Sequence, residues 1–305
     1  MAKFLITIFS IIFVTFAIFF SESNRETHSL FYVRGDDIHE IAKKDGSFGT
    51  APAFFIVEKI SIIKNKIPTG EYEIKKNETA ISVILKMISG KGVIRKLTIP
   101  EGHTVKMILD VINNNPLLFG KISESLQEAS LAPDTYFYKF GDSKVSIIQK
   151  MKNQMEKIRI RFASENKTNL SYEDIMILAS IIEKESGNIE EMKLISSVFH
   201  NRLKIKMRLQ SDPTVIYALT EGYGKMDRNL TRQDLWFESP YNTYRNGGLP
   251  PTPICCPGVE AIRAAMNPER TDYFYFVAEK NKRKHIFSKE YNTHLKAIKA
   301  AKSAS

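Results

Sequence analysis

The chain has 305 residues, of which 43% are hydrophobic, and it carries a net charge of +10. Its 15 glycines and 12 prolines are too few for a collagen-like or low-complexity protein, and its length leaves room for more than one folded unit. The positive charge comes mainly from lysines scattered along the chain without interleaved aromatic residues, so we expect no nucleic-acid partner.

A long apolar segment comes first along the chain. Residues Phe4 to Phe20 contain no charged side chain. As a helix they would be about 26 Å long at roughly 1.5 Å per residue, close to a membrane hydrocarbon core of about 30 Å. Lys3 precedes the segment, and basic residues beside a membrane span tend to stay in the cytoplasm. We therefore predict that residues 1–21 are a retained transmembrane anchor and that the rest of the chain lies outside the cytoplasm.

Residues 22–95 have the pattern of a small mixed unit. Helical patterns run from Asp36 to Lys44 and from Pro52 to Lys66, and the segment TGEYEI alternates as a short strand does. Thr79 is placed to cap a further helix that ends before Gly90. We expect these helices and short strands to fold together.

Residues 96–165 are predicted to connect this small unit to the rest of the chain. A strand ends at the turn Pro100 to Gly102 and leads into a helix that Thr104 can cap. A polar loop over residues 113–133 then precedes a helix from Lys144 to Ser164, whose apolar residues recur at helical spacing. We expect this last helix to bridge the two folded units.

A buried helix is the strongest local signal in the last segment, residues 166–305. Its start at Ser171 has the Ser-x-x-Asp pattern of a capping box. The residues from Ile175 to Ile182 are almost all apolar, which is typical of a helix surrounded by other elements.

Two carboxyl groups, Glu183 and Glu185, follow this apolar stretch. Helical geometry separates them by about 200° around the axis, so they cannot share one face. Glu185 continues the apolar stripe, and burial there is expected to raise the pKa of its carboxyl group, as a general acid near neutral pH requires. Spacing alone leaves open the alternative that Glu185 only pairs with a nearby arginine, Arg202 or Arg208.

Helices and loops alternate in the remainder of this segment. A Gly- and Pro-rich stretch over residues 239–258 is predicted to be loop. The other expected elements are a helix from Ile189 to Met207 with Ile189 on its apolar side, a helix that begins at Pro213 and that Asp212 or Ser211 can cap, a helix from Val259 to Met266, and a β-hairpin from Asp272 to Ser288 around a charged turn at Lys280 to Lys284.

The two cysteines, Cys255 and Cys256, are adjacent in the chain. They cannot build a disulfide framework or a paired-cysteine zinc site. The six histidines lack the spacing of metal ligands. We expect no metal and no other cofactor, and we assign no chemistry to the cysteine pair.

Several motifs occur in a fixed order between Ile175 and His294: ASIIEKES, SVFHNRLKIKMRLQSDPTVIYAL, SPYNTYRNGGLPPTPI, the pair Pro257-Gly258, and YFYFVA with KHIFS. Together they resemble the endolytic lytic transglycosylases of the MltG (YceG-like) family, which are single-span proteins of the bacterial inner membrane. The segment TGEYEI and the helix after it resemble the LysM-like subdomain of the same family. The resemblance implies an α+β fold with an N-terminal transmembrane helix, a small LysM-like α/β subdomain over residues 22–95 and a mixed α+β catalytic domain over residues 166–305.

The resemblance further implies that the second carboxylate of EKES, Glu185, is catalytic. The implied reaction cleaves the MurNAc–GlcNAc bond of nascent peptidoglycan strands, leaves 1,6-anhydroMurNAc ends and terminates strand elongation. One carboxyl group suffices, because the C6 hydroxyl of the muramic acid takes the place of water. The implied location is the periplasmic side of the inner membrane, beside peptidoglycan synthases.

Four polar residues are candidates for binding the glycan, because their side chains come from loops and suit sugar hydroxyl and acetamide groups. They are Gln210, Asp212, Asn242 and Tyr244. Asp212 has the alternative role of helix cap. Two other functions stay open: a non-catalytic peptidoglycan-binding anchor, and a hydrolytic muramidase in which Asp212 supplies the second carboxylate.

Overall fold

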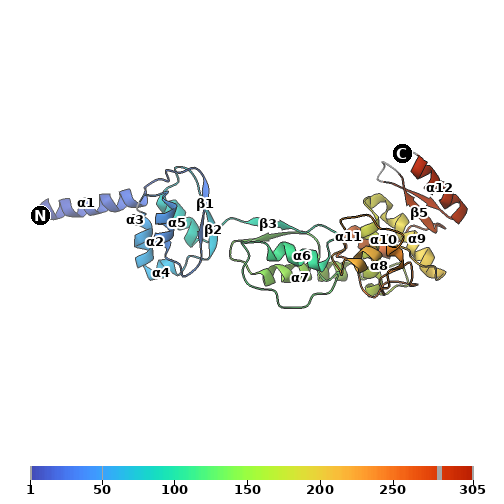
Figure 1. The fold of residues 1–305 in the computed structure, drawn as a ribbon. Helices are drawn as coiled ribbons and strands as arrows, with labels where there is room; N and C mark the ends of the chain where they lie inside the picture. The colour runs from blue at the N-terminus through green and yellow to red at the C-terminus, as the bar shows by residue number, and fades with distance from the viewer. Residues whose placement is uncertain (1, 50, 280–283, 304–305) are drawn as a thin grey trace. The chain divides into compact units, whose positions relative to one another are not determined.

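A computed structural model of the chain describes residues 2–49, 51–279 and 284–303 (Figure 1). The chain divides into two compact units. The first consists of Met1–Leu97, Asn115–Gly120 and Phe137–Lys144, and the second of Thr98–Asn114, Lys121–Tyr136 and Val145–Ser305. The predicted connecting region, residues 96–165, is therefore shared between the two units.

The first unit combines helices with an antiparallel strand pair. Figure 1 shows α2, α3 and α5 gathered beside the sheet of β1 and β2, in which Leu30 lies opposite Tyr72. Both side chains are buried, with those of the surrounding helices, in a single hydrophobic cluster. The elements are α1 (Ala2–Phe19), β1 (His28–Tyr32), α2 (Ile38–Asp45), α3 (Pro52–Lys59), α4 (Ser61–Lys64), β2 (Gly70–Ile74), α5 (Ala80–Ile88) and β3 (Arg95–Thr98), the last of which crosses into the second unit.

The predicted helix from Pro52 to Lys66 is instead two helices, α3 and α4. The backbone leaves the helical range at Ile60, which has φ −97° and ψ 87°. Ile60 belongs to an isoleucine-rich stretch, and β-branched side chains lose rotamer freedom in a helix. The prediction for α5 is confirmed, because the Thr79 side chain accepts a hydrogen bond from the backbone N–H of Ser82 at 3.4 Å.

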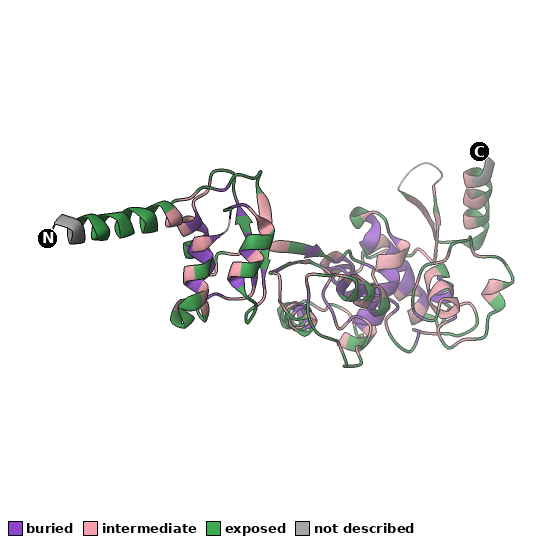
Figure 2. Cartoon of the chain, turned by 60° about the vertical axis from the view of Figure 1, so that its left-hand side comes forward, coloured by how far each residue is buried: buried purple, intermediate pink, exposed green. Residues whose placement is uncertain are grey.

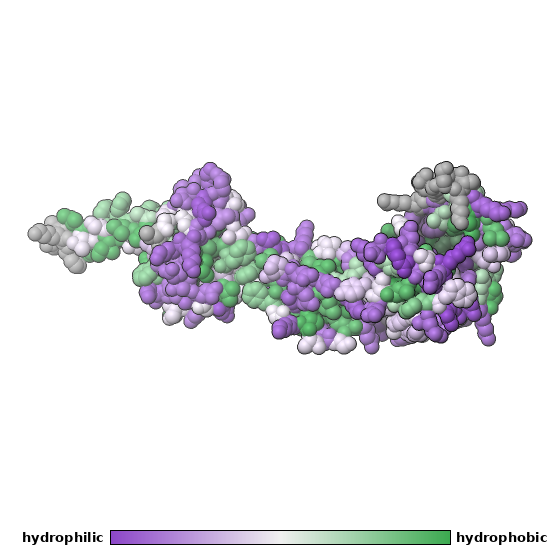
Figure 3. All heavy atoms as spheres, in the orientation of Figure 1, coloured by the Kyte–Doolittle hydropathy of each residue, from purple (hydrophilic) through white to green (hydrophobic). Residues whose placement is uncertain are grey.

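Helix α1 exposes a continuous set of large apolar side chains, including Ile6, Phe9 and Phe13. Figure 2 shows its surface as exposed and Figure 3 as mostly hydrophobic. Within the described residues, no helix is both long enough and apolar enough to cross a membrane.

The second unit is built around α8 (Tyr172–Glu185), which packs against α9 (Met192–Lys204) and α11 (Val259–Met266). Eight consecutive residues of α8, from Ile175 to Ile182, are buried, as predicted from their apolar run. The further elements are α6 (Val105–Asn113), β4 (Thr135–Tyr138), which pairs with β3, α7 (Lys144–Phe162), η1 (Ile189–Glu191), α10 (Asp212–Leu219), η2 (Asp234–Trp236), β5 (Tyr275–Ala278), β6 (His285–Ser288) and α12 (Tyr291–Ser303).

One prediction for this unit is wrong: Ile189 does not lie on the buried side of a helix. It belongs to the short 3₁₀ turn η1, and 60% of its surface is exposed. Glu191 turns inward instead, accepting a hydrogen bond from the backbone N–H of His285 at 3.0 Å and lying 2.8 Å from the ring Nδ1 of the same residue. These polar contacts, which the sequence pattern does not reveal, set the orientation of η1.

The predicted hairpin near the end of the chain is confirmed. Strands β5 and β6 pair antiparallel, with Phe276 opposite Phe287. Of the predicted charged turn from Lys280 to Lys284, residues 280–283 lie outside the described part of the chain. The mixed α+β class is also confirmed, since the described helices are accompanied by two-stranded sheets only.

Candidate active site

Helix α8 carries Glu185 at its last residue and is held at both its start and its middle. At the start, the Ser171 side chain accepts a hydrogen bond from the backbone N–H of Asp174 at 3.1 Å, which is the predicted cap. In the middle, the hydroxyl of buried Ser180 accepts from the backbone N–H of Ile254 at 3.0 Å. The thiol of Cys255 donates to the carbonyl of Ser180 at 3.3 Å. The position of Glu185 is therefore fixed by a helix that cannot easily shift.

The cysteine pair has a packing role in this arrangement. Both thiols are buried, and burial raises the pKa of Cys256 to about 12. Cys256 exchanges backbone hydrogen bonds with the turn after Pro100: its carbonyl accepts from Gly102 at 3.0 Å, and its N–H donates to His103 at 2.8 Å. The pair thus joins two loops beside α8.

The carboxyl group of Glu185 has the environment of a general acid. The hydroxyl of Ser211 donates to its Oε1 at 2.6 Å. Burial raises the pKa of Glu185 to about 7, and the negative charge of Asp212 acts in the same direction. The hydrogen bond from Ser211 and the charge of the Arg202 guanidinium both lower this pKa. The carboxyl group of Glu185 therefore keeps its proton to a higher pH than an ordinary glutamate does.

Glu183 has separate partners. Its Oε2 accepts a hydrogen bond from the backbone N–H of Gly258 at 2.9 Å, at the start of α11. Burial raises the pKa of this carboxyl group as well, opposed by the Gly258 hydrogen bond. Glu183 therefore ties α8 to α11, while Glu185 faces a cavity.

That cavity has a volume of about 330 Å³. Besides Glu185, it is lined by three of the four predicted substrate residues, which are Gln210, Asp212 and Tyr244. The hydroxyl of Tyr244 donates to Oδ1 of Asp212. The remaining lining residues are Arg202, Tyr275, Phe276, Tyr291 and His294, and we call the whole set the catalytic cavity.

The structure does not bring the fourth predicted residue, Asn242, to this cavity. Asn242 is fully buried, and its Nδ2 donates to the carbonyls of Leu235 at 3.0 Å and Phe237 at 2.7 Å. Its Oδ1 accepts from the backbone N–H of Tyr244 at 2.9 Å. Both polar atoms of the Asn242 side chain thus form hydrogen bonds with the protein backbone. Through the bond to the Tyr244 N–H, Asn242 helps to position Tyr244.

The loop before α10 is held in a strained form that places Gln210 in the cavity lining and directs Ser211 toward Glu185. Gln210 has a positive φ of 50°, a conformation that non-glycine residues rarely adopt. Thr243 maintains it, since its carbonyl accepts from Gln210 N–H at 3.2 Å and its Oγ1 accepts from Ser211 N–H at 3.0 Å. Ser211 occupies the cap position of α10, but its hydroxyl binds Glu185 instead of capping the helix. The predicted alternative, Asp212 as the cap, is wrong, because Asp212 is the first helical residue.

Other residues of the catalytic cavity were not predicted as part of the site. Arg202 was considered only as an ion-pair partner. It is buried, and it donates to the carbonyls of Phe274 at 2.7 Å and Leu209 at 2.5 Å, which connects α9 to both the hairpin and the Gln210 loop. Tyr291 and His294 come from α12, a helix that the predictions omit although its sequence has helix-forming residues.

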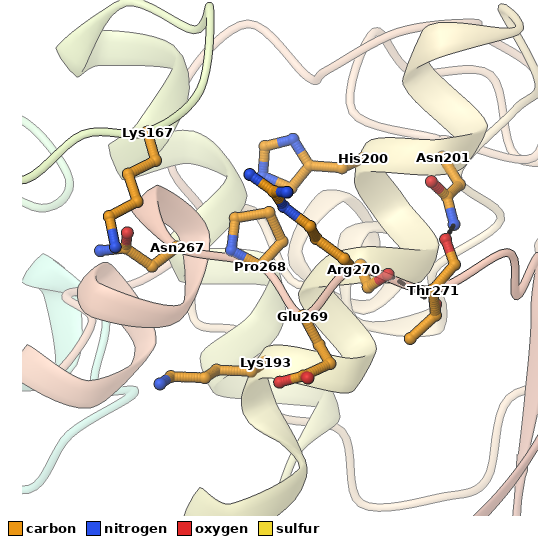
Figure 4. Close-up of a pocket in the computed structure, with 10 residues that line it drawn as sticks. Lys167, Lys193, His200, Asn201, Asn267, Pro268, Glu269, Arg270 and Thr271 are labelled. Atoms are coloured by element: carbon orange, nitrogen blue, oxygen red, sulfur yellow. Dashed lines mark hydrogen bonds between the residues drawn. The ribbon is translucent and has the colours of Figure 1, made fainter.

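A separate cavity of about 680 Å³ contains none of the predicted site residues (Figure 4). Figure 4 shows Lys167 beside Asn267, and Arg270 between His200 and Thr271. The ring of His200 lies 2.8 Å from the carbonyl of Ala265, and burial lowers its pKa. Among the residues that line this cavity, the one carboxylate belongs to Glu269, which is exposed. The cavity is therefore not lined by a buried acid.

The hydrogen bond from Ser211 gives a prediction about the Glu185 titration. Because this bond stabilises the carboxylate, we expect Ser211→Ala to raise the pKa of Glu185 further. The carboxyl carbon resonance of Glu185, followed by NMR against pH, should titrate at higher pH than in the parent protein. Ser130→Ala is the control, because the hydroxyl of Ser130 donates to the carbonyl of Gln127 at an exposed site and has no contact with Glu185 among the described residues. An unshifted or lowered titration in Ser211→Ala would contradict the assigned contact.

The fold and the site together define an α+β protein with a glutamate of raised pKa at the end of a buried helix, facing a cavity lined by aromatic and polar groups. The family model of the YceG-like family matches residues 33–300, so the chain belongs to this family.

Known relatives agree with this assignment. An endolytic murein transglycosylase of Bacillus subtilis is 39% identical over 190 residues, covering 62% of this chain and 51% of the relative. One from Streptococcus pneumoniae strain R6 is 26% identical over 313 residues, covering 85% of this chain and 56% of the relative. The chain thus spans about half the length of the curated relatives it matches. The 2.6 Å crystal structure of a YceG-like protein from Listeria monocytogenes is 32% identical with a TM-score of 0.58, covering 90% of this chain and 99% of that one.

Proposed function

We propose that the protein is an endolytic lytic transglycosylase that cleaves the MurNAc–GlcNAc bond of nascent peptidoglycan strands and so terminates their elongation. The observation that carries the proposal is Glu185, a cavity-facing carboxyl group whose pKa burial raises to about 7. The names of the relatives, endolytic murein transglycosylases, support it.

The proposed reaction uses Glu185 first as acid and then as base. Its protonated carboxyl group donates the proton to the bridging oxygen as the bond from muramic acid C1 breaks. The C6 hydroxyl of the same muramic acid then attacks C1, and its proton passes to the Glu185 carboxylate, which restores the acid. The product has a 1,6-anhydro ring and no water is consumed. A pKa near the working pH suits both proton transfers.

Three neighbours of Glu185 are proposed to bind the sugars. Gln210, Asp212 and Tyr244 line the same cavity and present an amide, a carboxylate and a phenol to it. Tyr275 and Tyr291 add aromatic rings, which pack against the apolar faces of ligands while their hydroxyls stay available for hydrogen bonds. Asn242 acts through Tyr244 and is not proposed to touch the glycan.

A hydrolytic muramidase is a second candidate, because Asp212 lines the cavity together with Glu185. A second carboxylate is what a glycosidase needs to activate water or to form a covalent intermediate. We favour the transglycosylase because the hydroxyl of Tyr244 already donates to the Asp212 carboxylate. A non-catalytic wall-binding protein has no use for a buried acid at a cavity.

Product analysis separates these functions. Purified protein is incubated with uncrosslinked glycan strands, and the new ends are identified by mass spectrometry. We expect 1,6-anhydroMurNAc ends at internal positions. Reducing MurNAc ends would overturn the proposal in favour of the muramidase, and intact strands would favour the wall-binding protein.

We further propose that α1 attaches the protein to the inner membrane and that the second unit lies on the periplasmic side. The apolar run from Phe4 to Phe20 and the exposed apolar side chains of α1 support this proposal. The chain should sediment with membranes until detergent is added, and protease added to spheroplasts should degrade the second unit. Full protection from the protease would contradict the periplasmic location.

The first unit is proposed to be a LysM-like module that binds glycan and keeps the enzyme near peptidoglycan synthases. The supporting observation is a separate compact unit of helices around the β1–β2 pair. Deletion of Asp36 to Gly90 should weaken binding to purified wall sacculi, and equal binding would count against the proposal.

A further inference from the structure

A larger cavity adjoins the catalytic cavity. Its volume is about 660 Å³, and two side chains, Gln210 and Tyr244, line both cavities. An extended ligand that contacts these two residues therefore reaches both. The other lining residues are Arg208, Arg232, Leu235, Trp236 and Arg245, and we call this second space the arginine cavity.

Hydrogen bonds hold two of its three guanidinium groups in place. Nη1 of Arg208 donates to the carbonyl of Tyr244 at 2.9 Å, and Nη1 of Arg245 donates to the carbonyl of Trp236 at 2.8 Å. Each of these arginines keeps further N–H groups for a ligand, since a guanidinium has five. Arg208 and Arg245 are thus anchored to backbone carbonyls of residues that also line the cavity.

The positive charge of the arginine cavity is only weakly compensated. Arg245 lies 3.6 Å from Glu238, whose side chain is 90% exposed, so water screens this pair. Among the described residues, Arg232 forms no ion pair and no side-chain hydrogen bond. Guanidinium groups arranged in this way favour a ligand with carboxylate groups.

An apolar surface accompanies the charge. Trp236 has 73% of its surface exposed and lines the cavity with Leu235. A ligand that fits this cavity therefore combines carboxylates with short apolar groups. Within a peptidoglycan strand, the sugars themselves carry no charge when the lactyl group is joined to a peptide, and the carboxylates belong to the stem peptide with its short aliphatic side chains.

We propose that the arginine cavity binds the acidic stem peptide of the strand that is being cut, so that the enzyme selects peptide-bearing glycan. The proposal rests on the proposed function, because it takes a peptidoglycan strand as the ligand of the catalytic cavity. Arg232 supplies the main carboxylate contact, Arg208 and Arg245 supply further ones, and Trp236 packs against the aliphatic part of the peptide.

The test compares two ligands that differ only in charge: labelled peptide-bearing strands, and the same strands with their peptide carboxylates converted to amides. Binding is measured by fluorescence anisotropy in the Glu185→Gln background, which prevents cleavage. We expect the acidic strands to bind about tenfold more tightly than the amidated ones, as removing one charge-assisted contact implies. Arg232→Gln should remove most of this difference, because Arg208 and Arg245 remain, and should leave the binding of amidated strands unchanged.

Arg270→Gln is the matched control, because Arg270 is an exposed arginine of the separate cavity in Figure 4. It should keep the preference for acidic strands. Equal binding of both ligands by the parent, an equal loss for both in Arg232→Gln, or the same loss in Arg270→Gln would each overturn the proposal. Because the readout is binding, a failure of the proposed reaction appears separately, as absence of anhydro ends with the active protein.

Discussion

Glu185→Gln should produce no detectable anhydro-ended strands while still binding glycan. Glutamine keeps the shape of the side chain, and its amide oxygen still accepts the hydrogen bond that Ser211 donates at 2.6 Å. It has no proton to donate to the leaving oxygen and cannot take one from the C6 hydroxyl. Loss of a general acid costs about 10² to 10⁴ in rate, and more where one group serves both transfers. The measurement is the rate of anhydro-end formation by mass spectrometry.

The matched control is Glu183→Gln, two residues away on the same helix. Its amide oxygen can still accept the N–H of Gly258, so the contact between α8 and α11 is kept. We expect this variant to retain measurable cleavage. If Glu183→Gln were inactive and Glu185→Gln active, the assignment of the catalytic carboxyl group would be wrong.

The free energy of unfolding of Glu185→Gln, measured against pH and compared with that of the parent, tests whether unfolding causes the loss of activity. The folded-state pKa of Glu185, about 7, lies above its ordinary value of 4.5, so the folded protein binds more protons than the unfolded chain between these values. This group therefore lowers the stability of the parent as pH rises from about 4.5 to 7. Glu185→Gln lacks this effect and should be at least as stable as the parent at pH 8.

Local sequence signals predicted those parts of the fold that local interactions decide. The caps at Thr79, Thr104 and Ser171 all bind a backbone N–H three residues later, and such contacts depend only on neighbouring residues. The pairing of β1 with β2 was not predicted, because it joins residues 28–32 to residues 70–74 and neither strand specifies its distant partner.

The site shows the same division between local and long-range information. Helical periodicity made Glu185 a candidate by placing it on the apolar side of α8, and the family resemblance favoured it over the alternative of a residue that only pairs with an arginine. Asn242 and Tyr244 were candidates because both are polar residues of a predicted loop, but only the folded loop decides that Tyr244 lines the cavity and that Asn242 is buried. Ser211 was read as a helix cap, and its contact with Glu185 depends on a loop that Thr243 holds from 32 residues away.

The buried amide of Asn242 gives the prediction with the largest effect on stability. In Asn242→Asp, the Nδ2 donor is replaced by an oxygen that faces the carbonyls of Leu235 and Phe237. Each unsatisfied buried group costs about 1–3 kcal/mol, and a buried charge adds to this. We expect a loss of about 3–5 kcal/mol at pH 7, a large share of a typical unfolding free energy of about 5–15 kcal/mol.

The free energy of unfolding is measured by the fluorescence of Trp236, the only tryptophan of the chain. In the sequence this residue stands between Leu235 and Phe237, whose carbonyls Asn242 binds. Urea unfolding followed at this position reports the second unit without interference from the first. The matched control is Asn246→Asp, since Nδ2 of Asn246 also donates to two carbonyls, those of Ser239 at 2.8 Å and Asn242 at 3.0 Å, but from an exposed position. Water can replace its lost donor, so we expect a change of less than about 1 kcal/mol. Equal losses in the two variants would show that burial of Asn242 is not what makes its hydrogen bonds necessary, and its assignment as the residue that positions Tyr244 would fail.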